Sequence, residues 1–128
     1  MQQFHFMWNC KNITFYASHK YTEMNGGAQD NQYKDIQDFL HHSRDCNEKN
    51  TIFLAICDGD YYLQKDSKTG DETKIKRLQR LTDGKTSFVL NIQELSGFLR
   101  DSLYFMALLN PKLYFTLFAI FGINFCYF

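Results

Sequence analysis

The sequence predicts an α/β fold, a small mixed sheet of three or four strands flanked by helices, from three observations. Short apolar runs of strand length alternate with segments in which apolar residues recur at helical spacing. Turn-forming residues, above all Asn25-Gly26-Gly27 and Asp58-Gly59-Asp60, separate these segments. Hydrophobic residues make up 45% and charged residues 22% of the 128 residues, a balance typical of one folded domain and not of a disordered chain.

The first half of the chain is predicted to form a strand, a helix and a second strand. Residues 12–21 are rich in β-branched and aromatic side chains and contain no glycine or proline, which is typical of a strand. A helix is expected from about Asp30, which we assign as its N-cap. Residues 51–57 form an uninterrupted apolar run, which predicts a strand covered on both faces. The apolar residues on one face of the helix are Tyr33, Ile36, Phe39 and Leu40.

The second half continues the alternation. Tyr61-Tyr62-Leu63 is expected to extend a neighbouring strand, and residues 73–81 to form a helix with its apolar residues on one face. Residues 86–90 predict a further short strand. Asn91 and Glu94 have the spacing of a capping box, which predicts the start of another helix. Strands and helices in this order imply a partly parallel sheet.

The composition changes once, near residue 102. Residues 102–128 contain nine aromatic residues and one charged residue, Lys112, so we expect a domain over residues 1–101 and an apolar tail after it. The uncharged run 113–128 would be about 24 Å long as a helix, shorter than the ~30 Å hydrocarbon core of a bilayer. Two interpretations stay open: weak membrane association through residues 103–128, or the product of a frameshift in AT-rich DNA, which we favour.

The net charge excludes a general electrostatic attraction to nucleic acid or anionic membranes. Fourteen basic and fourteen acidic residues balance, although a local basic patch remains compatible with that sum. The N-terminal residues have neither the basic start nor the apolar run of a signal peptide. We expect a cytoplasmic protein with free thiols, because the cysteine spacing matches no zinc motif. The four cysteines are Cys10, Cys46, Cys57 and Cys126.

Three blocks of sequence carry a resemblance to a known family. The first is His19-Lys20-Tyr21, the second is Gly-Gly-Ala-Gln-Asp-Asn-Gln-Tyr at residues 26–33, and the third is residues 52–62, which end in an Asp-Gly turn and two tyrosines. In this order they resemble the catalytic region of type II restriction endonucleases with a PD-(D/E)XK nuclease core, over residues 12–101. The resemblance implies a truncated form of that core. It further implies that the protein belongs to a restriction-modification system and acts on double-stranded DNA. It also implies Lys20 as the retained catalytic residue, and a homodimer is a further expectation.

The family's chemistry shows where this chain departs from the pattern. In that family, two acidic side chains on adjacent strands hold Mg²⁺, and a lysine two positions after the second acid orients or deprotonates the attacking water. Ser18 stands at the position of that second acid, and the first acidic residue of the chain is Glu23. We therefore expect the strand with the first acid to be absent or replaced, no two carboxylates within about 5 Å of the Lys20 ammonium, no bound Mg²⁺ and impaired cleavage.

Other groups offer weaker alternatives for a metal site. Glu23, Asp58 or Asp60 could supply carboxylates, but Asp58-Gly59 is more simply a tight turn in which glycine has positive φ. His41-His42 is interpreted as an exposed helix end, because adjacent residues of a helix point in different directions.

Two groups of residues are candidates for contact with DNA. Amide side chains at the start of the first helix could bind phosphates or adenine, or could instead cap the helix and satisfy carbonyls of the turn. The basic residues of 74–80 could follow a DNA backbone, or could form a solvated helix face. The candidates are Gln29, Asn31 and Gln32 in the first group, and Lys74 and Arg77, beside Lys76 and Arg80, in the second.

Three functions follow from these observations. The first is a type II restriction endonuclease, or a truncated remnant of one. The second is a small membrane-associated protein whose α/β part is a scaffold. The third is a module that binds DNA, or an endonuclease subunit, without cutting.

Overall fold

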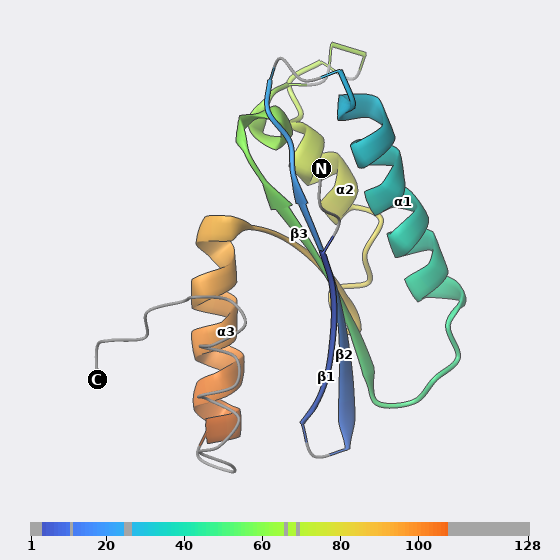
Figure 1. The fold of residues 1–128 in the computed structure, drawn as a ribbon, viewed down its shortest axis with the longest axis vertical. Helices are drawn as coiled ribbons and strands as arrows, with labels where there is room; N and C mark the ends of the chain where they lie inside the picture. Colours follow the sequence, from blue (N-terminus) through green and yellow to red (C-terminus); the bar gives the residue numbers. More distant parts are fainter. Residues whose placement is uncertain (1–3, 11, 25–26, 66, 69, 108–128) are drawn as a thin grey trace. The chain divides into compact units, whose positions relative to one another are not determined.

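The computed structural model describes residues 4–10, 12–24, 27–65, 67–68 and 70–107 (Figure 1). The chain divides into two compact units, Met1–Ile92 and Gln93–Phe128, and each is described here by itself. The first unit is a mixed sheet with helices, so the predicted α/β class is confirmed.

The sheet has four strands in the order of the sequence. They are β1 (Phe4–Cys10), β2 (Ile13–Tyr21), β3 (Thr51–Asp58) and β4 (Ser87–Asn91). β1 and β2 run antiparallel, whereas β2, β3 and β4 run parallel to one another. The partly parallel sheet inferred from the alternating elements is therefore confirmed.

Two helices make the crossovers between the parallel strands. α1 (Gln29–Asp45) follows β2, and α2 (Lys74–Gln79) lies between β3 and β4. Both lie on the same side of the sheet (Figure 1), as consecutive right-handed crossovers require when the strand order runs in one direction.

The core of the first unit lies between this face of the sheet and the two helices. Apolar residues of α1 and α2 recur at helical spacing and turn toward the strands, while β3 is buried along nearly its whole length on both faces, as the apolar run 51–57 predicts. The buried cluster consists of Ile36, Leu40, Ala55, Cys57, Tyr61, Tyr62, Ile75, Leu78 and Val89, with Tyr33, Phe39 and Leu81 packed against it.

Two local predictions are wrong. Helix α1 begins at Gln29 with Ala28 at the N-cap position and no side-chain cap, so Asp30 lies inside the first turn. Tyr61-Tyr62-Leu63 does not extend a strand but belongs to a 3₁₀ helix, η1 (Asp60–Leu63). The reason is that Gly59, at φ +99°, turns the chain away from the sheet, and both tyrosines then become buried against the core.

A strand precedes β2, and it contains no acidic residue. β1 pairs with β2 along its full length, with His5 opposite Ser18. This pairing covers an edge of β2 that would otherwise expose its backbone N–H and C=O groups. The seven residues of β1 therefore supply no carboxylate beside β2.

The second unit contributes α3, whose helix runs over Ile92–Ala107. It starts directly after Asn91, where the sequence predicts the start of a helix, and Glu94 lies in its first turn. The predicted apolar tail lies mostly outside the described residues. Within the described ranges, no helix combines the length and the apolar character needed to span a bilayer.

Candidate functional site

The candidate site lies at the edge where the parallel strands β2 and β3 end. The start of α1 and the short helix η1 come together at this edge (Figure 1). The carboxyl ends of β2 and β3 lie at the same edge of the sheet because the two strands run parallel. The sequence-based candidates Lys20, Gln29, Asn31 and Gln32 all come from this edge.

The strand ends are held together by a close backbone contact. The amide of Thr22 donates to the carbonyl of Asp58, with an N···O distance of 2.9 Å. Gly59 lies so close to Thr22 that a Cβ at position 59 would collide with the Thr22 carbonyl oxygen. A glycine is therefore required at position 59 for two reasons, the positive φ and the lack of space for a Cβ beside Thr22.

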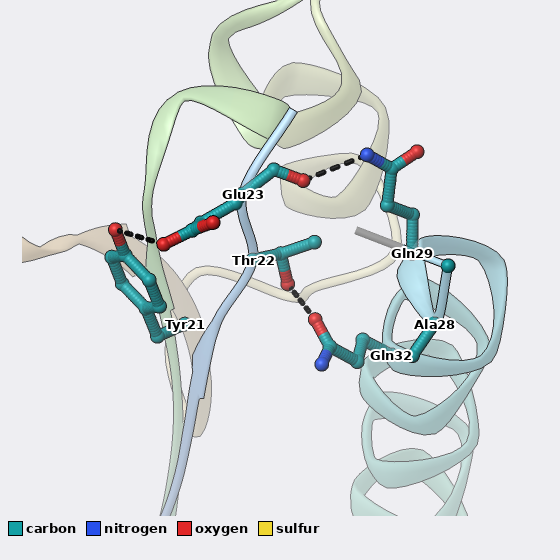
Figure 2. Close-up of a pocket in the computed structure, with 7 residues that line it drawn as sticks. Tyr21, Thr22, Glu23, Ala28, Gln29 and Gln32 are labelled. Atoms are coloured by element: carbon teal, nitrogen blue, oxygen red, sulfur yellow. Dashed lines mark hydrogen bonds between the residues drawn. The ribbon is translucent and has the colours of Figure 1, made fainter. Parts of the chain in front are cut away.

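A buried hydrogen-bond network joins the end of β2 to α1. The Thr22 hydroxyl donates to Oε1 of Gln32 and lies 3.0 Å from the Tyr62 hydroxyl. Figure 2 shows the Gln32 side chain pointing toward Thr22. Burial raises the pKa of the Tyr62 phenol, so it remains a neutral hydrogen-bonding group. Gln32, a candidate for DNA contact, is thus placed in the interior with 6% of its surface exposed.

Lys20 carries the most informative contact of the site. Its Nζ atom donates to Oδ2 of Asp35 on α1 at 2.7 Å. The Lys20 side chain is 7% exposed and the Asp35 side chain 47%, so a buried ammonium meets a carboxylate that reaches solvent. Ser18 is buried two positions before Lys20 and therefore lies on the same face of β2.

Asp35 is the functional candidate that sequence reasoning missed. The family's strand pattern predicts an acid at position 18 or near Lys20 in the sequence. Asp35 instead comes from the following helix, fifteen positions after Lys20. A signal was present nonetheless: Asp35 is adjacent to Ile36 and three residues after Gln32, both of which are buried. A crossover helix packs on the strand before it, so an acid beside its buried stripe can reach that strand.

The other acids considered in the sequence take different partners. Oδ2 of Asp58 lies 3.3 Å from Nε2 of His19, and the Glu23 carboxylate accepts from the Tyr21 hydroxyl at 3.4 Å. Glu23 and, more weakly, Asp58 and Asp60 raise the pKa of Tyr21 because their negative charges oppose its ionisation. Within the described part of the chain, Lys20 has no second ion pair, and no group of three or more metal-binding side chains is found.

A small pocket adjoins the end of β2. It has a volume of about 200 Å³ and lies between Tyr21, Thr22 and the first turn of α1 (Figure 2). The Gln29 amide donates to the Glu23 carbonyl at 2.7 Å and also to that of Met24. Gln29 thus satisfies carbonyls of the turn, the alternative to DNA contact, while Asn31 is exposed.

A larger groove of about 380 Å³ lies between α1, η1 and α2. It brings together three of the DNA-contact candidates, Gln29, Lys74 and Arg77. Of the neighbouring basic residues, Lys76 is exposed and Arg80 pairs with Glu72 at 2.6 Å. The structure therefore separates Lys74 and Arg77, which line a concave surface, from the other charges of the same segment.

Two further predictions concern residues away from these contacts. His41 and His42 are both exposed near the end of α1, as expected. Neither Cys46 nor Cys57 takes part in a disulfide bond among the described residues.

No family model matches the chain, and neither the curated proteins nor the solved structures contain a match.

Proposed function

We propose that this chain is a DNA-cleaving domain of the type II restriction endonuclease kind, with Lys20 and Asp35 at the centre of its site. The observation that carries the proposal is the 2.7 Å contact between the Lys20 ammonium and the Asp35 carboxylate. Asp35 thus places an acid next to the lysine, whereas the strand position at which the family has its acid is occupied by Ser18.

The arrangement of the elements supports the same proposal. The family's pattern is a strand with the lysine, then a loop, a helix and a buried strand that ends in an Asp-Gly turn. Here β2, α1 and β3 follow in that order, and β3 ends at Asp58-Gly59. The lysine strand also has a neighbour, β1, paired antiparallel on its other side. The acid has a different origin, since Asp35 reaches Lys20 from the helix.

Lys20 and Asp35 can divide the work of phosphodiester hydrolysis. The ammonium is fixed by the carboxylate, so it is positioned to orient a water molecule or to stabilise negative charge on the phosphate. The half-exposed Asp35 carboxylate can accept a proton from water or bind a cation from the solvent side. Ser18 adds a hydroxyl on the same face of the strand.

The donor set is compatible with Mg²⁺, although it is small. Mg²⁺ in nucleotide-processing sites is often held by one or two carboxylates, with water and substrate phosphates completing its coordination. Asp35 supplies one such carboxylate, so we expect the ion to bind together with DNA and weakly without it. When bound, Mg²⁺ would stabilise charge on the phosphate and lower the pKa of a coordinated water.

Cleavage of supercoiled plasmid DNA by the full chain tests the proposal. We expect nicking that requires Mg²⁺ and that falls by about 10²-fold or more in Lys20→Met and in Asp35→Asn, because each removes one member of the pair. Asp38→Asn is the matched control, since Asp38 is an exposed acid on the same helix. It should cut at the rate of the unchanged chain.

The proposal is contradicted by either of two results. One is a folded chain, verified by circular dichroism, that does not nick DNA with Mg²⁺. The other is nicking that Asp35→Asn leaves unchanged, which would assign the activity to other groups or to a contaminant. Lys20→Met keeps an unbranched apolar side chain that lacks only the terminal ammonium, so a loss of activity without loss of helical signal reports on the ammonium.

A further inference from the structure

The groove between α1, η1 and α2 is distinct from the contact between Lys20 and Asp35. Tyr33 and Gln37 of α1 line it, together with Lys74 and Arg77 of α2. Tyr33 and Asp35 are two residues apart, about 200° around a helix, so they lie on opposite sides of α1. The groove therefore belongs to the side of α1 that faces α2.

The ammonium of Lys74 is held in place by neutral groups. It lies 3.8 Å from the centre of the Tyr61 ring, and it donates to Oε1 of Gln64 at 3.3 Å. A cation over an aromatic face is attracted by the ring, but neither the ring nor the amide oxygen neutralises its charge. Lys74 is half-buried, so this charge is fixed in position at the wall of the groove.

Arg77 adds a second cation at the same wall. It follows Lys74 by three positions on α2, and both residues line the groove. Lys76 is about 200° from Lys74 on the helix and is exposed outside the groove. The positive charge of α2 is therefore divided between a concave surface and an open one.

One carboxylate lies in the groove with these cations. Asp30 is among its lining residues and accepts a hydrogen bond from the Tyr61 hydroxyl at 3.4 Å. Its negative charge opposes part of the attraction that Lys74 and Arg77 exert on an anion. This gives a direct test by charge, because removing the Asp30 charge should strengthen anion binding while removing the cations should weaken it.

We propose that this groove binds the phosphate backbone of duplex DNA through Lys74 and Arg77, with Asp30 limiting the affinity. The inference rests on the proposed function, which makes DNA the substrate. It assigns the binding of the duplex to a surface separate from the contact between Lys20 and Asp35. Backbone phosphates suit fixed ammonium and guanidinium groups, whose contacts depend little on base sequence. Gln29 lines both the groove and the small pocket beside Thr22, so the groove and this pocket adjoin each other at the start of α1.

Fluorescence anisotropy of a labelled duplex, measured with the full chain in EDTA, tests this proposal without cleavage. We expect Lys74→Gln with Arg77→Gln to weaken binding about tenfold. The slope of log affinity against log salt should fall by about two, because each of the two cations neutralises one phosphate. Lys76→Gln removes one charge from the same helix outside the groove and is the matched control, with an expected change below about twofold.

Asp30→Asn should tighten binding by about threefold, because the amide keeps an oxygen for the Tyr61 hydroxyl and removes the negative charge. A variant that merely loosened the fold would not gain affinity. The proposal is overturned if the double variant retains the affinity and salt slope of the unchanged chain, if Lys76→Gln weakens binding as much, or if Asp30→Asn weakens binding.

Failure of the groove and failure of the proposed function give different results. If the double variant binds DNA normally while Lys20→Met and Asp35→Asn still abolish nicking, the groove assignment is wrong and the nuclease assignment stands. If binding depends on Lys74 and Arg77 but no nicking occurs with Mg²⁺, the groove assignment stands and the chain binds DNA without cutting it.

Discussion

Single residues at the strand ends decide how the candidate site is assembled. Gly59 permits the close approach of β3 to Thr22, and that approach lets Thr22 reach Gln32 and Tyr62 across the start of α1. Lys20 lies on the same strand, two residues before Thr22, and its position is fixed by Asp35. The end of the strand that carries Lys20 is thus held by a backbone contact that involves neither Lys20 nor Asp35.

Replacing Gly59 should therefore be costly. Gly59→Ala places a Cβ against the Thr22 carbonyl oxygen and also strains the backbone at φ +99°. We expect the free energy of unfolding to fall by at least ~2 kcal/mol, measured by urea denaturation.

Gly84→Ala provides the matched comparison. Gly84 has a φ of +66°, but a Cβ there would have no neighbour within 4 Å, so it measures the backbone strain alone. We expect a cost of about 1 kcal/mol. Equal destabilisation by the two variants would show that the contact with Thr22 does not matter.

Whole elements were predictable where their patterns are long and regular. The apolar stripe of α1 and the continuous run of β3 carry period and length information that tertiary contacts reinforce. η1 was not predictable, because Tyr61-Tyr62-Leu63 has strand-like composition and only the turn at Gly59 redirects it. Asp35 was missed for a related reason, since its importance depends on how a helix packs on a strand.

The turn between α2 and β4 should make stability depend on pH. The Thr86 hydroxyl and the backbone amides of Lys85, Thr86 and Ser87 donate to the Asp83 carboxylate and hold its pKa well below the usual range. A carboxyl whose pKa is lower in the folded state stabilises the fold fully above its unfolded pKa, about 3.9. That stabilisation is lost as the pH falls from there toward the folded pKa.

We therefore expect Asp83→Asn to lose less thermal stability than the unchanged chain as the pH falls from about 4 to about 2, although it starts from a lower melting temperature. Circular dichroism at a series of pH values measures this difference. Asp45→Asn removes an exposed carboxylate of α1 and serves as the comparison. An identical acid dependence in Asp83→Asn and the unchanged chain would show that these hydrogen bonds contribute nothing to acid stability.

For the whole molecule, the balanced net charge conceals a local separation. Basic and acidic residues are equal in number, yet Lys74 and Arg77 line one groove while Lys20 pairs with Asp35 on the other side of α1. The composition of the sequence reveals only that the basic and acidic residues are equal in number. The placement of these charges depends on the two crossovers, which put α1 and α2 on the same face of the sheet (Figure 1).

The central claim is that Asp35 takes the role of the acid missing at position 18. Ser18 and Lys20 lie on the same face of β2, so an acid introduced at position 18 would also be near the ammonium. The most direct measurement compares the rates of Mg²⁺-dependent DNA nicking by the unchanged chain, Asp35→Asn, and Asp35→Asn combined with Ser18→Asp, each checked for folding. We expect activity to be lost in the single variant and regained in part by the double variant. Undiminished nicking by Asp35→Asn would contradict the claim.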